Sequence, residues 1–146
     1  MLNQRWIEMS NELVARVERV IEADLATVWE AISSGAEIGR WFIQADFEPV
    51  VGYAYTFTHE DTRITGVVKR CEPPNVLEYT WNVSGLDGET TVLWRLAAVD
   101  AGTRVEIAHT GIESLGDAAQ MMMSKFAGGW EQALDGLTEL LVVTAE

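Results

Sequence analysis

The sequence has few of the residues that carry covalent and metal chemistry. Cys71 is the single cysteine among 146 residues, so no disulfide can form within the chain. The two histidines, His59 and His109, are fifty positions apart and match no metal-binding spacing. We therefore expect neither a disulfide scaffold nor a metal site, and we expect no cofactor.

Positive charge is also scarce, with 10 Lys and Arg against 23 Asp and Glu and a net charge of −13. A surface of this charge repels phosphate backbones and anionic lipids, which argues against nucleic acid and membranes as partners. No stretch approaches the roughly 20 apolar residues of a transmembrane helix, and residues 1–10 lack the basic and apolar parts of a secretion signal. We expect a cytoplasmic protein.

Aromatic residues, by contrast, are dense: the chain has six tryptophans. Alternating apolar residues over 77–83 and 92–96 predict two strands with one buried face, which carry Trp81 and Trp94. Trp130 lies on a helical stripe instead. Packed cores favour aliphatic residues, whereas ligand pockets use aromatic walls. The three indoles therefore indicate an aromatic-lined core or cavity.

The length and the 48% hydrophobic content predict a single domain over 1–146, with residues 1–12 as an N-terminal leader. Alternation from Leu13 to Glu22 predicts the first strand. Asp24 is placed to cap a helix that ends at 33–35, and a second short helix leads to Trp41. Further strands are predicted near 42–48, 52–58, 62–72, 75–83, 89–99 and 103–110.

From Gly116 onward the apolar residues recur at helical spacing and predict one long helix with Asp117 as its N-cap. Gly128 and Gly129 each cost this helix about 1 kcal/mol relative to alanine, which suggests a close backbone approach or a local bend. Seven strands span about 30 Å and one helix about 10 Å. The sheet must therefore curl around the helix and leave a concave space for side chains or a ligand.

The order and spacing of several segments, from about Val14 to Leu141, resemble the START-like or SRPBCC helix-grip superfamily. Within it they are most similar to the activator of heat-shock protein 90 ATPase homologue-like proteins. The segments are residues 17–23 followed by 28–32, the pair Trp41-Phe42, residues 66–68, 72–81 and 102–111, and the pair Gly129-Trp130 ahead of Leu134, Leu137 and Leu141. Members commonly have proline where this chain has Asp24, a departure that changes a helix start and not the fold.

The resemblance implies an α+β helix-grip fold. A seven-stranded antiparallel sheet curls around a long C-terminal helix, with two short helices after the first strand. It also implies a hydrophobic cavity between sheet and helix, used across the superfamily for lipids, polyketides, hormones and other apolar molecules. It implies no particular chemistry.

We therefore predict reversible binding of a small, largely apolar molecule, and we assign no catalytic residue. The predicted lining consists of Tyr55, Phe57, Tyr79, Trp81, Trp94, His109, Met123, Phe126 and Trp130. His109 has inward strand parity, so it is either a base or ligand partner, or a core histidine satisfied by a neighbour. Arg19 has inward parity too, and we favour an ion pair with an acidic neighbour over a ligand carboxylate.

Two other functions remain open. One is an enzyme of the cyclase or hydrolase type that uses His109 with Tyr79 or Asp46, although Asp46 is more simply exposed to solvent. The other is a protein-interaction module, with a chaperone or a second copy of the chain as partner, which an exposed apolar patch would favour. Cys71 is expected to be unreactive, and His59 is expected in an exposed turn.

Overall fold

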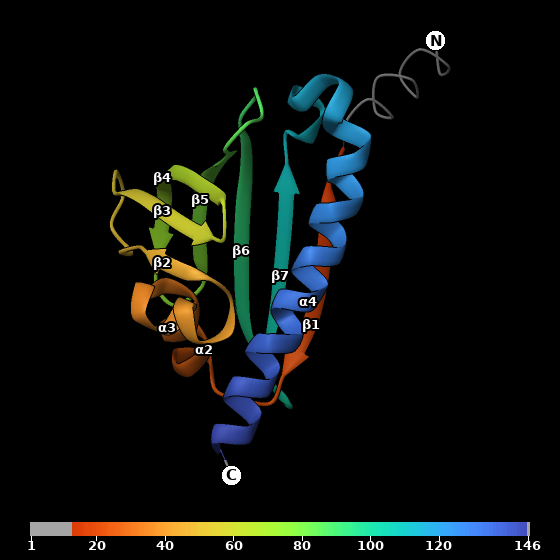
Figure 1. The fold of residues 1–146 in the computed structure, drawn as a ribbon. Coiled ribbons are helices and arrows are strands. Elements are labelled where there is room, and N and C mark those ends of the chain that lie inside the picture. Colours follow the sequence, from red (N-terminus) through yellow and green to blue (C-terminus); the bar gives the residue numbers. More distant parts are fainter. Residues whose placement is uncertain (1–12, 146) are drawn as a thin grey trace.

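The computed structural model describes residues 13–145, so the predicted leader over 1–12 lies outside the described residues. Seven antiparallel strands form one curled sheet, as the sequence predicts, and their order in the sheet is β1-β7-β6-β5-β4-β3-β2 (Figure 1). The strands are β1 (Ala15–Ile21), β2 (Gln44–Asp46), β3 (Ala54–His59), β4 (Thr62–Glu72), β5 (Val76–Val83), β6 (Thr90–Val99) and β7 (Gly102–Thr110).

The helices lie on the concave side of this sheet. Two short helices, α2 (Leu25–Ser33) and α3 (Gly35–Trp41), follow β1, and a 3-10 segment, η1 (Ile112–Ala118), follows β7. The long helix α4 (Ala119–Ala145) then runs along β1 and β7, and its C-terminal part reaches α2 and α3 (Figure 1). Because α4 covers one side of the sheet, the strands from β5 to β2 must curl toward it.

The capping residues in the sequence predicted the start of α2 correctly and the start of α4 wrongly. Asp24 caps α2, because its Oδ1 accepts from the Thr27 backbone N–H at 2.8 Å, and this bond lowers the pKa of the carboxyl group. Asp117 does not cap α4. It lies inside η1, where Gly116 has a φ of 61°, and α4 begins two residues later at Ala119. The left-handed backbone at Gly116 sets this break.

The predicted strand over 42–48 shrinks to Gln44–Asp46 because α3 continues to Trp41. The backbone N–H of Phe42 donates to the Ile38 carbonyl at 2.9 Å, so Phe42 closes the helix and does not join the sheet. This change of element turns the Phe42 ring into the interior, where it stacks on Trp130 with centroids 5.7 Å apart.

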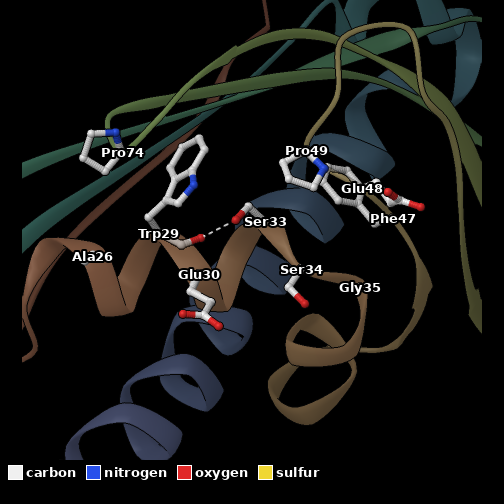
Figure 2. Close-up of a pocket in the computed structure, with 10 residues that line it drawn as sticks. All are labelled: Ala26, Trp29, Glu30, Ser33, Ser34, Gly35, Phe47, Glu48, Pro49 and Pro74. Carbon is white, nitrogen blue, oxygen red and sulfur yellow. Dashed lines mark hydrogen bonds between the residues drawn. The ribbon is translucent and has the colours of Figure 1, made fainter.

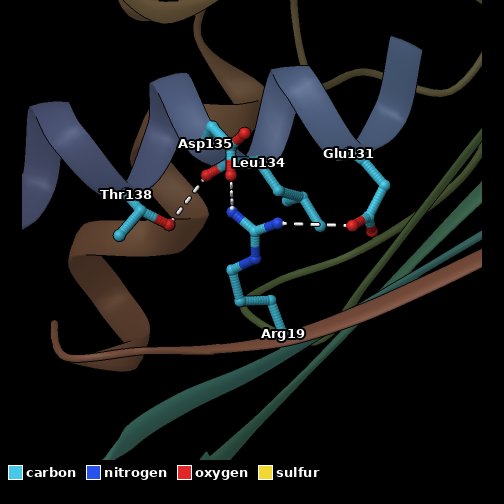
Figure 3. A network of polar contacts seen from close by, with 5 residues as sticks. All are labelled: Arg19, Glu131, Leu134, Asp135 and Thr138. Atoms are coloured by element: carbon cyan, nitrogen blue, oxygen red, sulfur yellow. Dashed lines mark hydrogen bonds and ion pairs between the residues drawn. The ribbon is translucent and has the colours of Figure 1, made fainter. Parts of the chain in front are cut away.

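Arg19 forms an ion pair that joins β1 to α4, which confirms the predicted pairing with an acidic residue (Figure 3). Its Nη1 lies 2.5 Å from Asp135 Oδ1, and its Nη2 lies 3.6 Å from Glu131 Oε2. The Arg19 side chain is 24% exposed, while both carboxylate side chains are more than half exposed. Because two acids already hold this cation, Arg19 is a clamp on the C-terminal half of α4 and not a free anion site.

The backbone of β4 lies too close to its neighbours at Gly66 for any side chain, where β4 pairs with β5. A Cβ at this position would lie 2.0 Å from the Thr80 carbonyl oxygen and 2.8 Å from the Tyr55 ring. The Tyr55 hydroxyl donates to that same carbonyl at 2.5 Å, so neither neighbour is free to move away. Only glycine fits where these three residues meet.

We predict that Gly66→Ala destabilises the protein by about 1–3 kcal/mol or more, because the added methyl group overlaps backbone and a buried ring. The matched control is Gly39→Ala in α3, where a Cβ would meet nothing within 4 Å, so stability should rise by up to about 1 kcal/mol. Urea denaturation measures both changes. Equal stability of the two variants would contradict the packing at Gly66.

Candidate functional site

The interior between the sheet and α4 is a continuous cluster of aromatic rings. Its ring centroids lie from 4.0 Å apart, for His109 and Phe126, to 6.4 Å apart, for Tyr79 and Trp81. The predicted lining residues in this cluster are Tyr55 and Phe57 from β3, Tyr79 and Trp81 from β5, Trp94 from β6, His109 from β7, and Phe126 and Trp130 from α4. All of them are buried.

The structure differs from the predicted lining at two places. Met123 is only partly buried, whereas Met122 lies on the buried face of α4 with Phe126. Phe42 joins the cluster but was missed, because a strand assignment over 42–48 gives no reason to direct its ring at Trp130. The signal was present in the Trp41-Phe42 pair that the family resemblance includes.

His109 is the centre of a chain of buried hydrogen bonds. Trp130 Nε1 donates to His109 Nδ1 at 3.0 Å, and His109 Nε2 lies 2.7 Å from Thr90 Oγ1. An indole nitrogen can only donate, so Nδ1 is the acceptor and this network assigns the imidazole proton to Nε2. The Thr90 hydroxyl in turn donates a hydrogen bond to the Trp81 carbonyl oxygen at 3.1 Å. Both imidazole nitrogens are therefore occupied.

Burial lowers the pKa of His109 from about 6.5 to about 3. Protonation would also place a second N–H directly against the N–H of Trp130, so geometry and desolvation both favour the neutral ring. His109 is a satisfied core histidine, and neither nitrogen keeps a free lone pair for a substrate. The sequence did not predict Thr90 as the partner of His109. Thr90 reaches this position through the register of β5 against β6, in which it lies opposite Trp81.

The other two candidates for acid–base chemistry are held elsewhere. The Tyr79 hydroxyl accepts from Trp94 Nε1 at 2.9 Å, and burial raises its pKa. Asp46 is exposed and accepts a hydrogen bond from the Tyr53 hydroxyl, which raises the pKa of Tyr53. The hydrogen bonds of His109, Tyr79 and Asp46 thus run to separate partners, which are Thr90 and Trp130, Trp94, and Tyr53, and they share none.

One polar group of the interior remains without a partner. Trp81 is 5% exposed, and its Nε1 is the one buried side-chain nitrogen or oxygen without a hydrogen bond among residues 13–145. A buried donor left unsatisfied costs about 1–3 kcal/mol. Such groups are rare in folded proteins and call for an explanation.

Trp81 also lines a small apolar pocket between the sheet and α4. The pocket has a volume of about 70 Å³ and is lined by Phe42, Trp81, Lys125, Phe126, Gly129 and Trp130. This volume holds about two water molecules, and ligand pockets commonly measure about 300–1,000 Å³. The aromatic rings fill most of the predicted cavity, so a ligand has room here only if the walls move apart.

Gly129, the second residue of the glycine pair of α4, lines this pocket, and Gly128 does not. A Cβ at Gly128 or at Gly129 would meet nothing within 4 Å, so the predicted close backbone approach is wrong. The helix runs unbroken through both residues. Packing gives no reason for two residues that weaken a helix, and their place beside the pocket is the feature left to explain them.

A larger groove of about 520 Å³ lies on the outside of α2 (Figure 2). The Trp29 ring stands in it between Pro74 and Pro49, while Glu30 points to the other side of the helix. Ser33, which also lines it, donates its hydroxyl to the Trp29 carbonyl at 2.7 Å. The groove holds no buried polar group that lacks a partner in the described chain, so the aromatic interior is the stronger candidate site.

The remaining sequence candidates show no sign of reactivity. Cys71 is partly buried with its Sγ 3.2 Å from the Pro49 carbonyl oxygen, and burial raises the pKa of the thiol. His59 is exposed, but it is the last residue of β3 and not part of the turn that follows, where the sequence placed it. Between residues 13 and 145, no group of three His, Cys, Asp or Glu side chains is placed to hold a metal ion. In the same range, no helix is long and apolar enough to cross a membrane.

Comparison with known proteins matches this architecture. The sequence profile described as Activator of Hsp90 ATPase homolog 1-like protein matches residues 22–142. Protein MLL2253 from Mesorhizobium loti is similar in structure, with a TM-score of 0.83 at 25% identity, over 90% of this chain and 98% of that one. CalU16 from Micromonospora echinospora has a TM-score of 0.69 at 28% identity, over 89% and 75% of the two chains. No curated protein matches the sequence significantly.

We predict that the His109 imidazole does not titrate near its usual pKa of 6.5 in the folded protein, because burial holds its pKa near 3. The unfolded chain then binds the proton more readily, so stability is lost as pH falls from about 6.5. Above pH 5, where carboxylates stay ionised, the loss approaches about 1.4 kcal/mol per pH unit.

His109→Gln tests this prediction, because glutamine keeps one acceptor and one donor but has no proton to gain. The variant should lose less stability than the wild type as pH falls from 6.5 to about 5, because the proton that His109 takes up on unfolding is removed from the difference between the two states. The NMR signal of the His109 ring followed against pH gives the direct measurement. A His109 signal that titrates near pH 6.5 would show that the ring is open to solvent.

Proposed function

Because this chain belongs to the Activator of Hsp90 ATPase homolog 1-like family, we propose that it binds a small, largely apolar molecule reversibly between the sheet and α4. The observation that carries this proposal is the aromatic interior, in which Trp81 lines an apolar pocket while its Nε1, buried from solvent, has no hydrogen-bond partner. A ligand that places an acceptor at this donor would remove the cost of the unmade hydrogen bond. The aromatic walls would supply its apolar contacts.

Binding requires that the pocket of about 70 Å³ opens, and α4 is the element that can move. Beyond the glycine pair it is tied to the sheet by Trp130, which donates to His109, and by the Arg19 clamp on Glu131 and Asp135. Before the pair, the described contacts of α4 with the sheet are apolar. We therefore place the opening movement in the segment from 119 to 127, with the glycine pair as its hinge.

The alternative functions have less support. An enzyme that uses His109 needs a free nitrogen on that ring, and both nitrogens are bound. The exposed large apolar side chains of the described residues are scattered over β1, the loop after β2, β4 and α4; they are Val20, Val50, Val51, Val67 and Met121. These scattered side chains do not by themselves favour a chaperone partner or a homodimer, and the cytoplasmic location stays a prediction.

We predict that Prodan, a neutral naphthyl ketone, binds saturably with one site per chain and that its emission shifts to the blue. Trp81→Phe keeps a ring but removes the N–H, so it should weaken binding roughly three- to tenfold, the value of one hydrogen bond. The matched control is Trp29→Phe, which changes the outer groove only. Fluorescence titration measures both, and thermal unfolding checks that each variant is folded.

A loss of binding in Trp29→Phe with no change in Trp81→Phe would move the site to the outer groove and overturn the proposal. Binding that never saturates would equally remove the case for a defined pocket in the interior.

We further predict that Gly128→Ala stabilises the protein by up to about 1 kcal/mol, because alanine is the better helix former. The new methyl group meets nothing within 4 Å, and Gly128 does not line the pocket, so the pocket itself is unchanged. If the pair is the hinge, Prodan should associate several-fold more slowly in stopped-flow mixing. Gly39→Ala is the control for the same change elsewhere. A stabilised variant with an unchanged association rate would exclude the hinge.

A further inference from the structure

The two edges of the sheet differ in their protection against other chains. The strand order places β1 at one edge and β2 at the other (Figure 1). A free edge offers unpaired N–H and C=O groups, and proteins usually protect it with a short strand, a proline, a bulge or lysines. The strand β2 has three residues and is soon followed by Pro49. The strand β1 has seven residues in one continuous register with β7, and it contains neither proline nor lysine.

The backbone along the outer side of β1 has no hydrogen-bond partner in the described chain. Over residues 15–20, the backbone of β1 is hydrogen-bonded to β7 alone. The helix α4 packs on the concave face of β1, where Ala15, Val17 and Ile21 are buried and where Arg19 reaches its two acids. These are side-chain contacts, so they leave the N–H and C=O groups of the outer edge unpaired.

The convex face of β1 carries two exposed charges, Arg16 and Glu18. Neither of them forms an ion pair among residues 13–145. On β7, Arg16 lies opposite Ala108, and Glu18 lies opposite Glu106. Like charges that face each other across a sheet are unfavourable, whereas opposite charges stabilise the pairing. Both side chains therefore lack an opposite charge across from them on β7, and only a strand on the free side of β1 can supply it there.

A second copy of β1 supplies both charges in one antiparallel register. With a two-fold axis through Val17 and perpendicular to the sheet, Arg16 of each copy lies opposite Glu18 of the other. The same register places Val14 opposite Val20, which is 46% exposed in the single chain. Moving the axis by one residue in either direction would place Arg16 opposite Arg16, or Glu18 opposite Glu18. The sequence of this edge is thus complementary to itself in charge.

We propose that the outer edge of β1 binds a second copy of this chain, so that the two sheets become continuous across a two-fold axis at Val17. Pairing along one strand makes a small interface, and interfaces below about 1,200 Å² are typical of transient complexes. The net charge of −13 on each copy opposes association, although charges more than about 8 Å apart are largely screened at physiological salt. The dimer is therefore reversible, and its population rises with protein concentration. This inference does not depend on the proposed function.

Sedimentation velocity at physiological salt, over a series of protein concentrations, measures the dimer. Arg16→Glu should weaken dimerisation about tenfold or more, because both opposite-charge pairs across the axis become like-charge pairs. The matched control is Arg104→Glu on β7, which makes the same change in net charge. Arg104 is exposed opposite Val20 and lies one strand away from the edge, so dimerisation should not change. Thermal unfolding checks that each variant is folded.

A mixture of two variants tests the register itself. Glu18→Arg should also weaken self-association, because arginines then face each other across the axis. When Arg16→Glu and Glu18→Arg are mixed, one edge carries two acids and the other two arginines, so a heterodimer at least as tight as the wild-type dimer should form. Three results would each overturn the proposal: wild-type protein that stays monomeric at every concentration, equal behaviour of Arg16→Glu and Arg104→Glu, and a mixture that does not associate.

Discussion

A chain of three buried hydrogen bonds holds α4 over the sheet, from Trp130 through His109 and Thr90 to the Trp81 carbonyl. These four residues come from α4, β7, β6 and β5, so the chain fixes the helix against three strands at once. Each link depends on a neutral imidazole with its proton on Nε2. Because a broken link would leave a buried group unpaired at about 1–3 kcal/mol, the helix position and the histidine tautomer are set together.

The same ties divide α4 into two unequal parts. The polar side-chain contacts between α4 and the sheet that the structure describes lie at or beyond position 130, where Trp130 and the Arg19 clamp act. The segment before the glycine pair relies on apolar packing, such as Phe126 on His109 with centroids 4.0 Å apart. Apolar contacts have no strict geometry, and for this reason the proposed opening is assigned to this segment and not to the rest of the helix.

The sequence predicted most of this architecture, because alternation, capping and punctuation are local signals. The curled sheet, the cap at Asp24 and the Arg19 ion pair follow from neighbours in sequence or from parity. The roles of Thr90 and Phe42 in the interior were not predicted. The position of Thr90 depends on the register of β5 against β6, and that of Phe42 depends on where α3 ends. The start of α4 was predicted wrongly, because the spacing of apolar residues does not reveal the left-handed backbone at Gly116 that interrupts the helix.

Aromatic composition alone did not separate a core from a binding site, and the polar groups inside it make the distinction. His109, the most obvious candidate from sequence, has both nitrogens bonded and belongs to the core. Trp81 looks like one more core ring, yet its Nε1 is unpartnered and its ring lines an apolar pocket. Folding stability alone favours satisfying every buried donor. The proposed ligand would give this donor the acceptor that the fold does not supply.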